Sequence, residues 1–253
     1  MVQSMNTKAL LTLASVARRP GLMTPHVSVD TVSEINYALL KERCGIHAVV
    51  FDKDNTLTAP YENVIHPNAR AGLATAIETF GVSNVAILSN SAGTKDDPDY
   101  EDAIAIEAAL GIAVIKHDEK KPGGLEETLQ HFGMEDPSAV CMVGDRLLTD
   151  VVFGNLYGML TVHTMPLCSG DDNARDNKVA KVIRGAENKT LYGNWFGGRW
   201  LLGKQLPHKY WPGPEECPLV LISTTTATGN TEDNNDSNND SNNAPANETK
   251  SSD

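Results

Sequence analysis

The sequence is poor in aromatic residues, in positive charge and in long apolar runs. The shortages of positive charge and of long apolar runs each exclude a class of protein. Aromatic residues make up 6% of the 253, and 21 lysines and arginines face 33 aspartates and glutamates, for a net charge of −12. Such an acidic chain lacks the basic surface that displaces counterions from nucleic acid, so we expect no nucleic-acid partner. No run of 18 apolar residues occurs, so we expect no helix that spans a bilayer.

Cysteine is also scarce. The four cysteines form no C-x-x-C pair and no complete zinc-ligand set: Cys44, Cys141, Cys168 and Cys217. We therefore expect reduced intracellular thiols, with Cys141 in the core.

Composition divides the chain into three parts. Residues 1–29 contain no acidic residue, and residues 7–19 have one polar stripe at helical spacing. This amphipathic helix either packs on the domain or serves as a membrane-surface or mitochondrial targeting segment. Residues 30–212 are the expected domain. Residues 213–253 are the expected linker and acidic, Asn-rich tail, which we expect to be disordered from Thr224 on because it has almost no large apolar side chains.

Between the ends, apolar β-branched runs alternate with helical patterns. The runs cover residues 46–51, 85–90, 112–116, 139–145 and 160–164, and the helical patterns cover 67–81, 99–111, 123–133 and 149–158. Each helical pattern ends in glycine, a common left-handed helix stop. Strict alternation predicts an α/β fold with a doubly wound parallel sheet and helices on both faces.

Polar side chains follow each of the first four apolar runs. They are Asp52 with Asp54, Ser89 with Asn90, Lys120 with Lys121, and Asp145 with Asp150. In parallel sheets, ligands bind beyond the carboxyl ends of the strands, so these groups should meet at one edge. Acid, hydroxyl and ammonium groups together are what phosphoryl transfer requires.

These motifs carry a family resemblance over residues 46–165. The order D-x-D-x-T, S-N, K-P and G-D-x-x-x-x-D resembles the haloacid-dehalogenase (HAD) superfamily of aspartyl phosphatases. More narrowly, "VVFDKDNTLT", "ILSNSAG", "HDEKKPG" and "VGDRLLTDVVFGNLYGM" resemble the mitochondrial phosphatidylglycerophosphatases of fungi and related small bacterial phosphatases. The resemblance implies a HAD-like Rossmannoid fold and hydrolysis of phosphatidylglycerophosphate to phosphatidylglycerol, a step of cardiolipin biosynthesis.

The resemblance and the chemistry together assign roles. Asp52 would be the nucleophile, and Asp54 the general acid and base. Asp52, the Asp54 carbonyl and Asp145 would bind Mg²⁺, with Asp150 either a direct or an indirect ligand. Ser89 and the backbone near Asn90 would donate to phosphate, and Lys121 would neutralise its charge. Lys120 is the alternative to Lys121, and the resemblance alone favours the lysine directly before proline.

Several residues keep a second interpretation. Ser89 and Asn90 could cap a turn, and Asp150 could cap the helix that it opens. His117 and Arg146 lie next to motifs, so either could touch substrate or stand in an exposed loop. The acidic loop of Asp96, Asp97 and Asp99 is interpreted as solvated.

Spacing and composition bear on the substrate. One helix and one strand fill each gap between Asp54, Ser89 and Lys121, so no cap domain fits and the site should be open to a large or membrane-bound phosphomonoester. Residues 188–214 hold all three tryptophans, Trp195, Trp200 and Trp211, among lysines and arginines. This segment either meets an anionic membrane surface or closes the core.

Three hypotheses follow. The first is a Mg²⁺-dependent phosphatidylglycerophosphate phosphatase, peripheral to the mitochondrial inner membrane on its matrix side. The second is a soluble HAD phosphatase for a protein or metabolite phosphate. The third is a non-catalytic HAD-fold scaffold, which the complete motif set disfavours.

Overall fold

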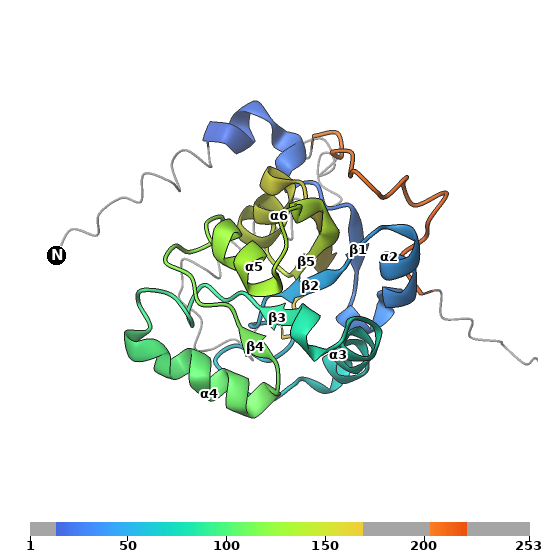
Figure 1. Ribbon diagram of the computed structural model, residues 1–253. Helices are drawn as coiled ribbons and strands as arrows, with labels where there is room; N and C mark the ends of the chain where they lie inside the picture. Colours follow the sequence, from blue (N-terminus) through green and yellow to red (C-terminus); the bar gives the residue numbers. More distant parts are fainter. Residues whose placement is uncertain (1–13, 169–202, 222–253) are drawn as a thin grey trace, which may run out of the picture. The chain divides into compact units, whose positions relative to one another are not determined.

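Six parallel strands form one sheet in the order β1-β6-β5-β2-β3-β4 (Figure 1). The computed structural model describes residues 14–168 and 203–221. The strands are β1 (Val27–Val29), β2 (Ala48–Phe51), β3 (Val85–Ile87), β4 (Ala113–Val114), β5 (Val140–Gly144) and β6 (Leu160–Thr164). The predicted parallel sheet and five of its strands are confirmed. The sequence analysis missed β1, because three residues at a sheet edge are too few to show a pattern.

The helices fall between the strands in the alternation that the sequence predicts. They are α2 (Tyr37–Arg43), α3 (Pro67–Phe80), α4 (Glu101–Leu110), α5 (Leu125–Phe132) and α6 (Val152–Tyr157), with a π-helical turn, η6 (Leu147–Val151), before α6. Gly111, Gly133 and Gly158 end their helices in the left-handed conformation. Gly81 differs: its φ of 83° and ψ of 148° direct the chain straight toward β3. The short helix α2 was not predicted.

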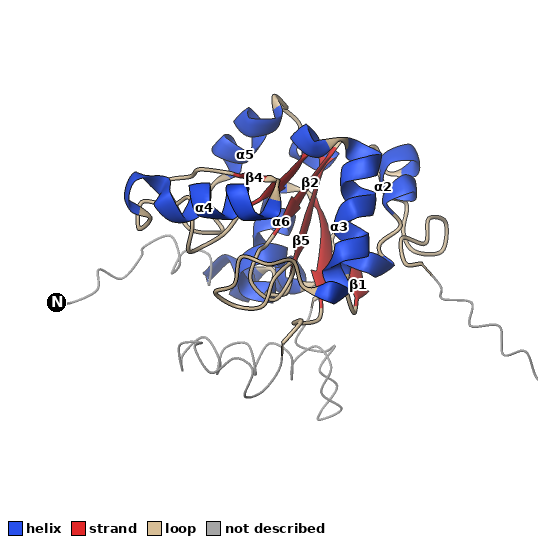
Figure 2. Cartoon of the chain, turned by 90° about the horizontal axis from the view of Figure 1, so that it is seen from below, coloured by secondary structure: helices blue, strands red, loops and turns tan. Residues whose placement is uncertain are grey.

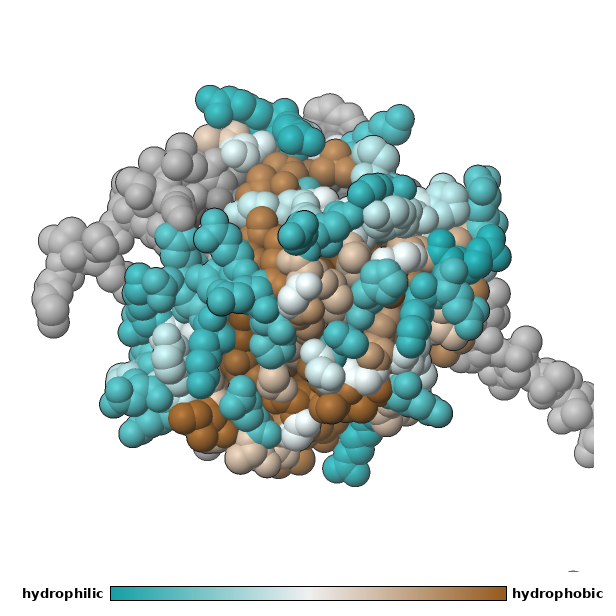
Figure 3. Space-filling model, viewed as in Figure 1, coloured by the Kyte–Doolittle hydropathy of each residue, from teal (hydrophilic) through white to brown (hydrophobic). Residues whose placement is uncertain are grey.

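Side chains alternate along the central strands between two apolar cores. Val49 and Phe51 of β2 belong to the core that α2, α3 and α4 cover, whereas Val50 between them belongs to the core beneath α5 and α6. Helices accordingly lie on both sides of the sheet (Figures 1 and 2). On the face seen in Figure 3, hydrophilic residues lie mainly around the rim and hydrophobic ones nearer the centre. Burial on both faces explains why the strands read as unbroken apolar runs.

Both ends of the described chain pack on the domain. Residues 14–18 are helical, and Val16 is buried with Leu22 and Val152, so the described end of the amphipathic helix packs on the domain. Near the other end, Cys217 and Leu219 are buried, and Ile35 pairs with Val220. Residues 27–29 and 213–221, which the sequence analysis gave to the N-terminal segment and the linker, therefore belong to the packed domain.

The described residues include only part of the remaining end segments for which the sequence makes predictions. Residues 1–13, Trp195, Trp200 and the tail from Thr224 lie outside the described residues. Trp211 lies inside them and is buried at 6% exposure, and its indole N–H donates to the carbonyl of Cys217 at 3.0 Å. At this position the core interpretation is correct. Cys44, Cys141 and Cys217 are buried thiols outside any disulfide, Cys44 Sγ lies 3.5 Å from Cys217 Sγ, and Cys141 lies in the core as predicted.

The intervals between the strand ends hold short elements only. Asp54 is followed by a flap, residues 55–66, and then by α3 and β3, while α4 and β4 occupy the next interval. No cap domain is present in residues 14–168, in agreement with the spacing. Within the described ranges, no helix combines the length and the apolar character required to cross a membrane.

Candidate active site

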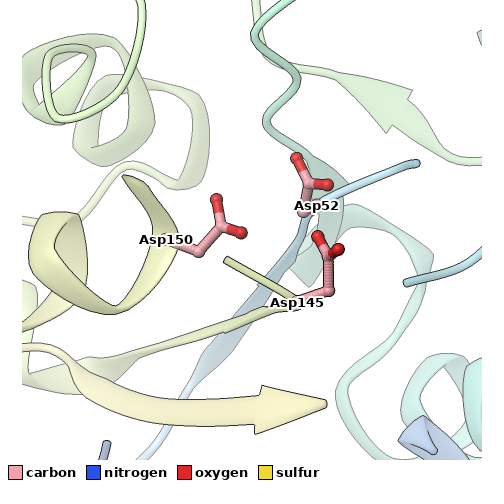
Figure 4. A group of neighbouring side chains, drawn as sticks. All are labelled: Asp52, Asp145 and Asp150. Atoms are coloured by element: carbon pink, nitrogen blue, oxygen red, sulfur yellow. The ribbon is translucent and has the colours of Figure 1, made fainter. Parts of the chain in front are cut away.

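Three carboxylates converge at the carboxyl edge of the sheet. Asp52 directly follows β2, Asp145 follows β5, and Asp150 lies in the π-helical turn η6. Figure 4 shows the three side chains turned toward a common space. One ligand atom of each lies within 4.8 Å of the others, and all three residues are buried, with 8%, 1% and 1% exposure.

Lys121 joins this cluster from the loop after β4. Its Nζ lies 2.6 Å from Asp52 Oδ1 and 2.6 Å from Asp150 Oδ1, and its side chain is fully buried. Lys120 instead points outward, about half exposed, and pairs with Asp96 on the surface at 2.7 Å. Of the two lysines that the sequence left as alternatives, Lys121 is thus the one at the carboxylates.

Lys121 lies between two of the three buried carboxylates, and the pKa values of the lysine and of Asp52 reflect both this contact and burial. Burial alone would lower the pKa of Lys121, but Asp150 and Asp52 together raise it above its usual range. Burial raises the pKa of Asp52, and Asp150 adds to the effect, whereas Lys121 and Arg146 lower it; the net shift is upward. The raised pKa of Asp52 therefore reflects its burial first, and its charged neighbours second.

The local backbone explains the position of Asp150. The π-helical turn widens the start of the helix, and the Arg146 N–H donates to Asp150 Oδ2 at 3.1 Å. A Cβ atom on Gly144 would lie 2.3 Å from the same oxygen, so only glycine leaves room for this carboxylate. Asp150 therefore fixes the turn and contacts Lys121, and metal binding by Asp150 stays a prediction.

Asp54 has a different environment from Asp52. Its Oδ1 accepts from Lys53 Nζ at 2.7 Å and from the Tyr61 N–H at 3.0 Å. Lys53 is 3% exposed and also donates to the Glu62 carbonyl at 2.8 Å. Among the described residues, both hydrogen bonds to Asp54 go to Oδ1. Asp54 is thus tied to the flap.

Ser89 and Asn90 organise the loop after β3. Ser89 Oγ is buried and accepts from the N–H groups of Ser91 and Ala92, at 3.2 and 3.4 Å. Asn90 Oδ1 accepts from the Lys121 N–H at 2.8 Å, which connects the two loops. The capping interpretation of Ser89 holds in this structure, while phosphate binding by Ser89 and Asn90 stays a prediction.

Two expectations for flanking residues need correction. Asp97 is 4% exposed, not solvated, because its carboxylate accepts from the N–H groups of Gly93, Asp102 and Ala103. His117 is not in an exposed loop: it is 2% exposed, with its ring between two backbone carbonyls. Substrate contact by Arg146 stays a prediction.

Sequence reasoning missed the roles of Lys53 and Asn55. Asn55 has a φ of 65°, and its carbonyl accepts from the Leu167 N–H at 3.0 Å, which connects the turn after β2 to the segment after β6. Asparagine is one of the few residues that tolerate this left-handed conformation. For Lys53, the signal was a lysine between two aspartates directly after a buried strand.

The carboxylate set fits a divalent cation. Mg²⁺ prefers oxygen ligands, and one carboxylate oxygen from each of three aspartates gathers here within 4.8 Å of the others. Asp52, Asp145 and Asp150 could hold the ion through their side chains, and Asp54, whose Oδ1 is bound to Lys53, could contribute its backbone carbonyl.

Comparisons with known proteins agree with this arrangement. A family model described as mitochondrial PGP phosphatase matches residues 7–167. The chain is 44% identical over 154 residues to the chloroplastic phosphatidylglycerophosphate phosphatase 1 of Chlamydomonas reinhardtii, covering 60% of this chain and 56% of the relative. It is 43% identical over 173 residues to the chloroplastic/mitochondrial phosphatidylglycerophosphate phosphatase 1 of Arabidopsis thaliana, covering 67% and 49%.

A yeast relative is matched over more of its length. The mitochondrial phosphatidylglycerophosphatase GEP4 of Saccharomyces cerevisiae is 34% identical over 158 residues, which cover 61% of this chain and 84% of GEP4. The chain spans about half the length of the two plant and algal relatives. The match to the family model covers more than half of this chain and contains all four motif loops. The chain therefore belongs to the mitochondrial PGP phosphatase family.

Proposed function

We propose that this chain is a Mg²⁺-dependent phosphatase that hydrolyses the phosphomonoester of phosphatidylglycerophosphate and releases phosphatidylglycerol. The observation that carries the proposal is the Asp52 carboxylate, held at the end of β2 by Lys121 and facing Asp145 and Asp150. The names of the relatives supply the substrate. A scaffold without catalytic activity would not need three buried carboxylates within 4.8 Å of one another, because such a cluster costs stability.

The chemistry has two steps. An Asp52 oxygen attacks phosphorus, the bond from phosphorus to the glycerol oxygen breaks, and Asp54 gives its proton to the departing alkoxide. Asp54 then takes a proton from water as that water attacks the aspartyl-phosphate, which releases orthophosphate and restores Asp52. With Oδ1 held by Lys53, Oδ2 of Asp54 is the oxygen that carries the proton.

The remaining groups stabilise charge. Lys121, already between Asp52 and Asp150, would neutralise the negative charge that develops on the phosphoryl oxygens. Bound Mg²⁺ would supply positive charge between the carboxylates and the phosphate. Ser89 and the backbone N–H groups near Asn90 would donate to the phosphoryl oxygens.

The exposed flap supports a lipid substrate over a small soluble one. Tyr61 and Val64 are 54% and 62% exposed, and the Tyr61 N–H is bound by Asp54. The flap thus presents apolar side chains next to the proposed general acid. The basic, acid-free segment 1–29 and the family name support a peripheral position on the matrix side of the mitochondrial inner membrane.

The direct test is release of phosphate from phosphatidylglycerophosphate in mixed micelles, with a soluble phosphate ester measured in parallel. We expect a kcat/KM for the lipid well above that for the ester. A clear preference for the soluble ester would favour a metabolite or protein substrate, and no release from either would favour the scaffold. Co-sedimentation with cardiolipin-containing and neutral liposomes tests the membrane position separately: anionic vesicles should bind the chain, and salt should weaken the binding.

A further inference from the structure

His117 is enclosed between the loop after β3 and the loop after β4. Its Nε2 lies 2.9 Å from the Ser89 carbonyl oxygen, and its Nδ1 lies 2.7 Å from the Glu119 carbonyl oxygen. Its backbone N–H donates to the Gly93 carbonyl at 2.7 Å. A single residue therefore bonds to the loop after β3 at two points, Ser89 and Gly93.

The two ring contacts have a chemical requirement. A carbonyl oxygen only accepts hydrogen bonds, so each contact needs an N–H on the ring. The imidazolium has both N–H groups, and a neutral ring makes one of the two bonds. In either form, the ring is held by backbone groups and directs no nitrogen toward solvent, in keeping with its 2% exposure.

A second hydrogen bond, which does not involve the histidine, joins the same two loops. Asn90 Oδ1 accepts the N–H of Lys121, the lysine whose Nζ reaches Asp52. The loops also approach closely at Gly93, where a Cβ atom would lie 2.8 Å from the Ile115 carbonyl oxygen. Two surface ion pairs, Lys95 with Asp118 and Lys120 with Asp96, span the same loops but are exposed and contribute little.

We propose that His117 is a positioning residue, which holds the phosphate-binding loop at Ser89 in register with Lys121. Through its bond to the Ser89 carbonyl, the ring would fix where the hydroxyl and N–H groups of that loop meet a phosphoryl group that Lys121 also contacts. The proposal rests on phosphoryl binding at this site, not on the identity of the lipid. His117 itself touches neither the reacting atoms nor the carboxylates.

The test compares His117→Gln with His117→Asn. The glutamine amide can place an N–H near the position of Nε2 and keep the Ser89 bond, whereas the asparagine amide can reach only the position of Nδ1 near Glu119. We expect His117→Asn to lose about 10- to 100-fold in kcat/KM on a soluble phosphate ester, as small misplacements do, and His117→Gln to retain most of it. His131→Gln, a change at an exposed histidine at the end of α5, is the control and should behave as wild type.

Binding of inorganic phosphate, measured by calorimetry in the presence of Mg²⁺, separates positioning from folding and needs no turnover. We expect the Kd for phosphate to rise in His117→Asn by a similar factor while the folded fraction, measured by circular dichroism, stays the same. Equal activity and equal phosphate affinity in the two variants would overturn the proposal, as would losses that only follow the folded fraction. If the wild type binds phosphate but does not hydrolyse the lipid, the substrate proposal fails and this one is still tested.

Discussion

Asp52 and Asp54 are separated by a single residue in the chain, and each is paired with its own buried lysine. The surroundings of the two carboxylates nevertheless differ. Asp52 faces inward, where Lys121 is shared with Asp150 and where Asp145 adds a third carboxylate. Asp54 faces the flap, where Lys53 is shared with the Glu62 carbonyl. The first pair lies in a buried cluster of carboxylates, and the second ties a carboxylate to a loop. This difference suits one carboxylate to attack phosphorus and the other to carry a proton.

The largest expected effect is that of Asp52→Asn, which removes the nucleophile with little change of shape. Loss of a covalent nucleophile should lower kcat by about 10⁴-fold or more, on the lipid and on soluble esters alike. The fold should remain, because one of the three crowded carboxylate charges has been removed. The measurement is steady-state kinetics, with thermal unfolding as the check on folding. Near-normal turnover of this variant would exclude an aspartyl-phosphate on Asp52.

Removal of metal should also abolish activity. Metal binding should in addition depend on the carboxylate cluster of Asp52 and not on the side chain of Asp54. EDTA should stop turnover and Mg²⁺ should restore it, while Ca²⁺, with its larger and looser coordination shell, should restore little. Mg²⁺ should also raise the melting temperature of the wild type, since a ligand at 100 times its Kd adds about 2.7 kcal/mol of stability. That rise should disappear in Asp145→Asn and persist in Asp54→Asn. Full activity after metal removal would contradict this prediction.

Asp54→Asn should depend on the leaving group, unlike Asp52→Asn. General acid catalysis contributes typically about 10²- to 10⁴-fold, so we expect a loss in that range on alkyl phosphates, whose alkoxide needs a proton. An aryl phosphate, which leaves as a stable phenolate, should lose less in the first step. The measurement is the ratio of kcat/KM for alkyl and aryl esters in variant and wild type. Equal losses on both esters would remove Asp54 from the role of general acid.

Replacement of the two buried lysines and of one exposed lysine should cause losses of decreasing size. Lys121→Met leaves Asp52 and Asp150 without their cation and should cost about 3 to 5 kcal/mol of folding stability in addition to most activity. Lys53→Met should cost less activity, about 10-fold, because it frees the flap but leaves the carboxylate cluster intact. Lys120→Met removes an exposed ion pair worth about 1 kcal/mol or less and is the matched control. Urea unfolding and kinetics on one ester give both readouts, and a Lys120→Met loss as large as that of Lys121→Met would reverse our assignment.

The smallest expected effect concerns the flap surface. The double change Tyr61→Ser, Val64→Ser should lower kcat/KM about 10-fold for the lipid in micelles and leave a soluble ester unchanged, because little folded-state contact is lost at exposed positions. Val82→Ser, Ile104→Ser is the matched control, since these residues are equally exposed, at 52% each, in η3 (Val82–Asn84) and α4. Equal losses on both substrates would mean that the flap acts through folding and not through the lipid.

The sequence predicts the parallel sheet and its polar edge because both depend on patterns that repeat along the chain. Residues 48–51 are apolar throughout because both faces of β2 are covered, and Asp52 of the site follows directly. The short strand β1 and the helix α2 were missed because their positions depend on contacts with distant segments. The burial of Asp97 and His117 was also beyond prediction, because backbone groups of folded loops bind them and no spacing in the sequence reveals these groups. The burial of Lys53 depends in the same way on the Glu62 carbonyl, in addition to its neighbour Asp54.

The account depends most on Asp52 as the residue that becomes phosphorylated, and chemical trapping tests this directly. The wild type, Asp52→Asn and Asp54→Asn are each incubated with Mg²⁺ and an aryl phosphate, quenched in acid and digested, and the phosphorylated peptide is identified by mass spectrometry. We predict a phosphoryl group on the peptide that contains Asp52, more of it in Asp54→Asn because water is no longer activated, and none in Asp52→Asn. Phosphate release without any acyl-phosphate, or a phosphoryl group on another residue, would contradict the account.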